Sequence, residues 1–182
     1  MNLVERLERV SERRARLMRE LEQLPPAAHE WRPDEGSWSL LEIVEHLVLA
    51  EQDVMVDLWN LSGLEPRPRS FANIARYWLV LAILRFKIPV PVPSEGMKPR
   101  GGRSMEELSE LWAQQHQRVS EFMAGLRPGD ERAAIFVHPV TGPMSIRDGV
   151  RMLEVHLSRH IGQAERTMRL WAKQGEGVAG GR

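Results

Sequence analysis

The chain has 182 residues, with 25 basic and 25 acidic side chains and therefore a formal net charge of zero. This length suits one domain, and a neutral chain has no overall field that would attract nucleic acid or an anionic membrane. The absence of cysteine excludes disulfides and thiolate metal sites, so any metal would be bound by His, Asp or Glu. The first residues, MNLVERLERV, lack the pattern of a secretory signal, and the longest apolar run, 78–84, is far shorter than the ~20 residues of a membrane-spanning helix. We therefore expect a cytoplasmic protein that binds neither nucleic acid nor a membrane.

The first predicted element is an amphipathic helix over residues 3–24, where apolar side chains recur three or four positions apart. Pro25 and Pro26 end this helix. Its stretch SERRARLMRE is rich in arginine, as RNA-binding segments are, but glutamates are interleaved with the arginines. We therefore interpret the stretch as a solvated helix face with opposite charges one turn apart.

Three further long helices are predicted, and each begins with a serine that is followed three residues later by an acid. In such a capping box the hydroxyl and the carboxylate each satisfy a backbone N–H group that the first turn leaves unpaired. Apolar residues at helical spacing follow each box. The predicted helices span about 39–61, 104–126 and 145–171 and open with Ser39 and Glu42, Ser104 and Glu107, and Ser145 and Asp148.

The connection over residues 62–103 is unusually long for a helix bundle. Residues 71–87 favour a short fifth helix, and the stretch IPVPVPSEGMKPRGGR must then be extended, because its prolines fix φ and lack N–H donors. The apolar segment 74–86 is expected to be either a dimer contact or a lid. Because no segment alternates convincingly like a strand, we predict an all-α four-helix bundle over 1–174 with a flexible tail at 175–182.

Three of the six histidines fall in the middle of predicted helices. His156 and His160 are four residues apart and lie on one face of the last helix. His46 lies with Ile43 and Leu47 at the inward face of an earlier helix. At a rise of about 1.5 Å per residue, the three histidines lie roughly 10–21 Å from the starts of their helices, and so in the middle of each. Burying an imidazole there without a hydrogen-bond partner would cost free energy. A divalent cation would satisfy all three rings and keep one coordination position open, as in catalytic metal sites. The alternative is that these are hydrogen-bonded core histidines.

The other three histidines are not expected to be ligands. His29 lies in a proline-rich turn, His116 lies at the margin of a helix face, and His138 precedes a proline in a predicted loop. The six tryptophans are interpreted as packing residues rather than as a cofactor site.

Two acids and one amide are candidates for supporting or catalytic roles. Glu42 and Asp53 share the helix side of His46, so either could orient an imidazole. Their alternative roles are helix capping for Glu42 and an exposed acid for Asp53. Gln163 follows His160 by one turn and could donate to a bound ligand or bond to another helix.

Two tracts, WRPDEGSWSLLEIVEHL and HPVTGPMSIRDGVRMLEVHLSRHIGQ, resemble the DinB-like family, damage-inducible proteins related to the YfiT type. The similarity covers about residues 3–173. The resemblance implies a four-helix bundle of up-down-down-up topology with a crossover between the second and third helices. It also implies a site for a divalent metal, often nickel or zinc, with His46, His156 and His160 as ligands, and it implies a homodimer.

The resemblance also suggests a small-molecule substrate, because some relatives are transferases or isomerases that use bacillithiol, mycothiol or glutathione. The leading hypothesis is a metal-dependent S-transferase for a low-molecular-weight thiol, in which the metal favours the thiolate form. A metal-dependent hydrolase is a second hypothesis. A metal-binding or structural dimer without turnover is a third. The enzyme hypotheses require an open cleft beside the histidines, whereas the third requires that residues 71–95 seal the site.

Overall fold

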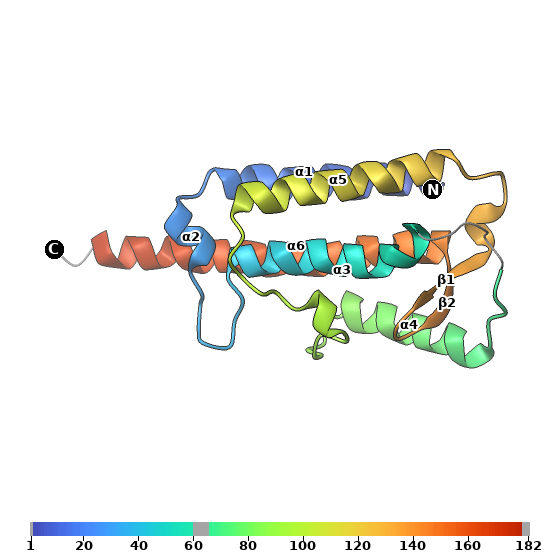
Figure 1. The fold of residues 1–182 in the computed structure, drawn as a ribbon. Helices are drawn as coiled ribbons and strands as arrows, with labels where there is room; N and C mark the ends of the chain where they lie inside the picture. The colour runs from blue at the N-terminus through green and yellow to red at the C-terminus, as the bar shows by residue number, and fades with distance from the viewer. Residues whose placement is uncertain (1, 60–65, 180–182) are drawn as a thin grey trace.

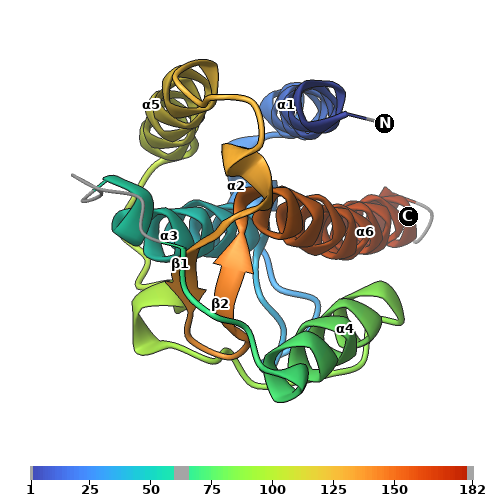
Figure 2. The same cartoon turned by 90° about the vertical axis from the view of Figure 1, so that its right-hand side faces the viewer.

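Four long helices, α1, α3, α5 and α6, lie side by side and form a bundle (Figures 1 and 2). The computed structural model describes residues 2–59 and 66–179. In Figure 1, the third and fifth helices run from left to right, and the first and sixth run from right to left. The elements are α1 (Leu3–Glu22), α2 (Pro26–Glu30), α3 (Leu40–Trp59), α4 (Phe71–Arg85), the 3-10 turn η1 (Glu95–Met97), α5 (Met105–Ala124), the 3-10 turn η2 (Asp130–Arg132), β1 (Ala134–His138), β2 (Gly142–Ser145) and α6 (Ile146–Ala179).

The predicted helices are confirmed, and two of the three predicted capping boxes form both of their hydrogen bonds. At the third, the Asp148 backbone N–H donates to the Ser145 hydroxyl, but the Asp148 carboxylate accepts from that hydroxyl and not from a backbone N–H. The Ser39 hydroxyl accepts the backbone N–H of Glu42 at 3.2 Å, and the Glu42 carboxylate accepts that of Ser39 at 2.9 Å. Ser104 and Glu107 form the same pair of bonds at 3.1 and 2.7 Å. These boxes satisfy N–H groups at the starts of α3 and α5. The last two residues of the predicted 39–61 helix lie outside the described residues.

Residues 175–182 are predicted to form a flexible tail, and this stays a prediction. In the structure, α6 continues through Gly175 and Gly177 to Ala179, beyond the predicted helix end near residue 171. The helical hydrogen bonds of the preceding turns extend into this segment despite its glycines, because adding one residue to an existing helix needs no new nucleus. Residues 180–182 lie outside the described residues.

A small sheet corrects the expectation that the chain has no strands. β1 and β2 form an antiparallel pair in which Val137 faces Pro143 and His138 faces Gly142. The strands have five and four residues, which is too short for an alternating pattern to be visible in the sequence. The chain is otherwise mostly helical, as predicted.

Helix α4 is fixed against α6 and the hairpin at its first turn. Arg69 forms an ion pair with Asp148 at 2.6 Å, and the Asn73 amide donates to the Thr141 carbonyl at 3.0 Å. Gly142 has a positive φ of 77°, and a Cβ atom there would lie 2.4 Å from the Asn73 amide nitrogen. Only glycine fits this close approach of the hairpin turn to α4.

Two groups of buried apolar side chains form the core. One fills the middle of the bundle and includes Leu21, Val44 and Leu157; the other joins α4 and the hairpin to the bundle and includes Tyr77 and Met144. Between them these groups bury one face of every long helix. No helix within the described ranges combines the length and the apolar character that crossing a membrane requires.

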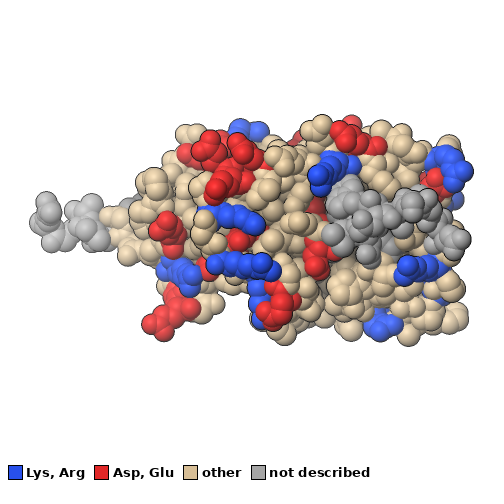
Figure 3. Space-filling model, viewed as in Figure 1, with Lys and Arg blue, Asp and Glu red and all other residues tan. Residues whose placement is uncertain are grey.

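Acidic and basic side chains are interspersed over most of the face shown in Figure 3. The lower right of that face, where α4 lies, differs, because it carries basic side chains among uncharged ones and no acidic ones. The sequence explains the difference, since residues 66–94 contain five basic residues and no Asp or Glu.

Candidate metal centre

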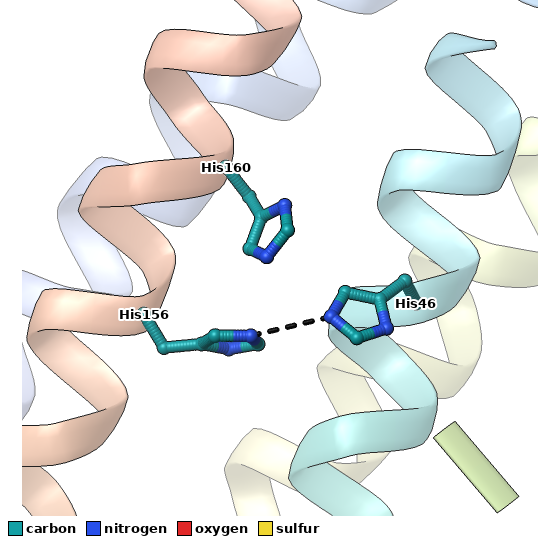
Figure 4. A group of neighbouring side chains, drawn as sticks. All are labelled: His46, His156 and His160. Carbon is teal, nitrogen blue, oxygen red and sulfur yellow. Dashed lines mark hydrogen bonds between the residues drawn. The ribbon is translucent and has the colours of Figure 1, made fainter. Parts of the chain in front are cut away.

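Three histidines from two antiparallel helices meet between α3 and α6. Figure 4 shows the rings of His46, His156 and His160 converging on one point. The ring centroids of His46 and His160 are 4.7 Å apart, those of His156 and His160 are 4.6 Å apart, and the Nε2 atoms of His46 and His156 are 3.2 Å apart. One ring nitrogen from each residue lies within 4.8 Å of the other two. Sequence reasoning selected the same three residues.

Hydrogen bonds at the outer nitrogens orient two of the rings. His46 Nδ1 lies 2.8 Å from the Met97 carbonyl oxygen, and His160 Nδ1 lies 3.0 Å from Gln163 Oε1. Both oxygens are acceptors, so each Nδ1 carries the proton and each Nε2 keeps its lone pair. The Nε2 atoms of His46 and His160 can therefore bind an ion through their lone pairs. In metal sites, the other ring nitrogen commonly donates to an acceptor in this way, and that hydrogen bond orients the imidazole.

Burial keeps these histidines neutral. The His46 and His160 side chains are 4 % and 6 % exposed, while His156 is half-buried. Burial lowers the pKa of all three rings, and together with the nearby His46 it lowers the pKa of His160 to about 3. A neutral imidazole is the form that binds a cation.

The donor set fits a divalent transition metal. Zinc–imidazole bonds of ~2.0–2.1 Å place tetrahedral donors roughly 3.3 Å from one another. His46 and His156 already lie at this separation, and one nitrogen of His160 lies within 4.8 Å of both. Three neutral nitrogens without thiolate or carboxylate suit a divalent first-row transition metal, since imidazole is a good ligand for several of these ions.

The histidines stand in the wall of a cavity of about 700 Å³. α4 contributes Val80, Ile83 and Leu84 to the lining, and the loop after it contributes residues 89–93. The Trp38 ring lies against the imidazoles, with its centroid 4.8 Å from that of His46. The cavity is thus mostly apolar, and the segment expected to be either a lid or a dimer contact forms one of its walls.

The supporting residues named from the sequence lie in three different situations. Glu42 accepts from the Ser39 backbone and pairs with Arg32 at 2.6 Å, so both its oxygens are engaged away from the histidines. Asp53 is half-buried beside Gly96, and it does not line the cavity. Gln163 does line it, and its oxygen accepts the Nδ1 proton of His160.

The other histidines are outside the cluster of possible ligands within the described residues. His29 bonds to the Leu21 carbonyl at the end of α1 at 2.9 Å. His116 is half-buried in α5, where burial lowers its pKa to about 4. His138 in β1 is 7 % exposed and lines the cavity, and burial lowers its pKa to about 4. Its Nδ1 accepts the N–H groups of Val140 and Thr141, so its proton is on Nε2.

Sequence reasoning missed several parts of the site. The Met97 carbonyl is a backbone group in a short turn 51 residues from His46. Every residue has such a carbonyl, so the residue type at position 97 does not predict this hydrogen bond. The sequence indicates a packing role for Trp38, and no pattern in it indicates a role for Arg159. The one available signal was position, because Trp38 precedes the Ser39 cap and Arg159 stands between the two histidines of α6.

A family model described as the DinB superfamily matches residues 9–164 of this chain. No curated protein and no solved structure shows a significant match.

Proposed function

Because the chain belongs to the DinB superfamily, we propose that it is a cytoplasmic, zinc- or nickel-dependent transferase that uses a low-molecular-weight thiol. The observation that carries this proposal is the position of the three histidines in the wall of a cavity. Three protein donors leave a coordination position free, and about 700 Å³ is enough space for a small molecule beside it. The opposite helix directions in Figure 1 support the up-down-down-up topology of the family resemblance.

The side chains of the cavity have separate roles in this proposal. His46, His156 and His160 hold the ion, while Gln163 and the Met97 carbonyl fix two of the rings. When bound, the ion supplies positive charge that favours the thiolate form of a thiol. The apolar lining from α4 and its loop limits water beside that thiolate, which leaves it more reactive towards an electrophile.

Hydrolysis receives less support, because it needs a base within reach of the attacking water. Glu42 and Asp53 are not in the lining of the cavity. Glu51 does line it, but one of its oxygens is already engaged, because it accepts from the Trp112 indole. A purely structural site also receives less support, since α4 walls the cavity without filling it.

The proposal includes a homodimer formed through the outer face of α4. Phe71 and Phe86 are 92 % and 76 % exposed, and several other apolar side chains of this helix are exposed with them. Sedimentation at micromolar concentration is expected to give a dimer. Phe86→Glu should dissociate it, whereas Val4→Glu, which changes an apolar residue of α1 that is 60 % exposed, should not. A monomeric wild-type protein would contradict this part of the proposal.

The thiol chemistry is tested with cobalt in the site. Titration with low-molecular-weight thiols is expected to produce a sulfur-to-cobalt charge-transfer band with at least one of them. The band should vanish in His160→Ala and persist in His116→Ala, which removes a histidine outside the cluster. Turnover of a simple ester or amide without any effect of thiols on the cobalt spectrum would favour the hydrolase.

A further inference from the structure

The cavity has an unusual balance of charge. Among the described residues that line it, Glu51 is the only acid and Arg159 the only arginine or lysine. The three histidines bring no negative charge, and burial favours the protonated form of Glu51 by raising the pKa of its carboxyl, one oxygen of which accepts from the Trp112 indole. A divalent ion would therefore enter a site that contains no anion to balance it. An excess of positive charge in a mostly apolar cavity favours an anionic ligand.

Arg159 is positioned to be the partner of that anion. Its Nη1 donates to the carbonyl oxygens of Ile88 at 2.9 Å and Ile83 at 3.3 Å, at the end of α4. These bonds hold the guanidinium at the cavity wall and occupy one of its three nitrogens. None of the carboxylates whose side chains the structure describes pairs with it. The remaining N–H groups can bind a carboxylate in the paired geometry that suits arginine.

A second cation stands close to the same stretch of α6. The Lys87 amine lies beside Gly162, where a Cβ atom would be 2.9 Å from Nζ. Lys87 is exposed, and it belongs to the 66–94 segment that has no acidic residue. Lys87 therefore adds positive charge next to the stretch of α6 that contains Arg159 and Gln163.

We propose that the cavity binds a carboxylate-bearing small molecule, with the carboxylate on Arg159 and the other end of the molecule at the histidine cluster. In the setting of the proposed function, on which this inference rests, the thiol substrate is an anionic one. The alternative is that Arg159 only caps the carbonyl groups at the end of α4. If Arg159 is only a cap, the affinity of the cavity for a ligand should not depend on the charge of the ligand. If Arg159 binds a carboxylate, an anionic ligand should bind more tightly than a neutral one.

The test uses three thiols that share a three-carbon chain and differ at the far end, namely mercaptopropionate, mercaptopropanol and mercaptopropylamine. Each is titrated into the cobalt-loaded protein by calorimetry and absorption. One charge-assisted pair predicts that the carboxylate binds roughly ten- to a hundredfold more tightly than the alcohol, with the amine weakest. Arg159→Gln should abolish this preference and Arg159→Lys should retain part of it. Arg151→Gln is the matched control, because Arg151 stacks on Trp78, 4.8 Å from its ring centroid, and does not line the cavity.

A parallel titration of the metal-free protein with butyrate, followed by NMR, separates this inference from the thiol proposal. Butyrate binding that depends on Arg159, together with no effect of any thiol on cobalt, would retain the anion site and remove the thiol function. Equal affinities for the three thiols in the wild type would overturn the anion site and retain the thiol function. If Arg159→Gln does not fold, the ligand series in the wild-type and Arg159→Lys proteins still gives the answer, because it compares charges on the ligand.

Discussion

The cavity has two walls that are built in different ways. One wall is formed by α3 and α6, whose regular turns place His46, His156 and His160 together and neutral. The other is formed by α4, the proline-rich loop and the hairpin, which contribute mainly apolar side chains. The wall formed by α3 and α6, the histidine wall, supplies the ligands for a metal ion. The wall formed by α4, the loop and the hairpin, the apolar wall, determines the size and polarity of the molecule that can bind beside the ion. Metal binding and ligand binding should therefore respond to different substitutions.

The largest effect is expected from removal of a histidine of the cluster. His46→Ala, His156→Ala or His160→Ala should reduce metal content from about one divalent ion per chain to none, because two imidazoles alone form a weak site. Elemental analysis of protein purified without a metal-affinity tag measures this. His116→Ala should keep full occupancy. Full occupancy in the His156→Ala protein would show that the ion is bound elsewhere.

The pH dependence of stability reports on both walls of the cavity, because His160 belongs to the histidine wall and His138 to the apolar wall. In the folded protein, the pKa values of His160 and His138 are about 3 and about 4, below the ~6.5 of an unperturbed histidine. At a pH between the folded and unfolded pKa values, the unfolded chain binds more protons than the folded one. The free energy of unfolding therefore decreases as the pH falls. The metal-free protein should stay folded at pH 7. On acidification from pH 7 to 5 it should lose about 2 kcal/mol through His160 alone.

Urea unfolding of chelator-treated protein at both pH values measures this loss. His138→Gln should lose less stability than the wild type over the same interval, since its side chain does not titrate there. Unfolding by a chelator at pH 7 would instead mean that the ion holds the fold together.

A smaller effect is expected from the partner of His160. Gln163→Leu removes the acceptor of the Nδ1 proton but leaves all three ligands, so metal affinity should fall about 10- to 100-fold. Competition with a chromophoric chelator gives the affinity. Gln174→Leu, which changes an exposed glutamine of the same helix, is the control and should leave the affinity unaltered. An unchanged affinity in Gln163→Leu would mean that Gln163 does not orient the ring.

The apolar wall should give the smallest change in metal binding and a clear change in ligand binding. Ile83→Trp adds bulk to a residue that lines the cavity, so thiol affinity should fall roughly tenfold, or about 1.4 kcal/mol, at unchanged metal content. Leu79→Trp on the outer face of α4, where Leu79 is 59 % exposed, should leave both unchanged. Loss of metal in Ile83→Trp would mean that the two walls are not independent.

The difference between the two walls also explains which parts of the site can be predicted from the sequence. Helix starts follow from short-range chemistry, as in Ser39 with Glu42, and the pairing of His156 with His160 follows from the helical repeat. The Met97 carbonyl, the short hairpin and the contacts of Arg159 depend on irregular segments far apart in the chain. No periodic pattern records such contacts, so the cavity and its charge become visible only in the folded chain.

The central claim is that the three histidines form an open metal site facing the cavity. X-ray absorption at the metal edge of the loaded protein tests it most directly. The predicted spectrum has three imidazole donors and one further light-atom neighbour, which a sulfur neighbour replaces when mercaptopropionate is added. A spectrum without three imidazoles, or one with a fourth protein donor that no added ligand displaces, would contradict the claim.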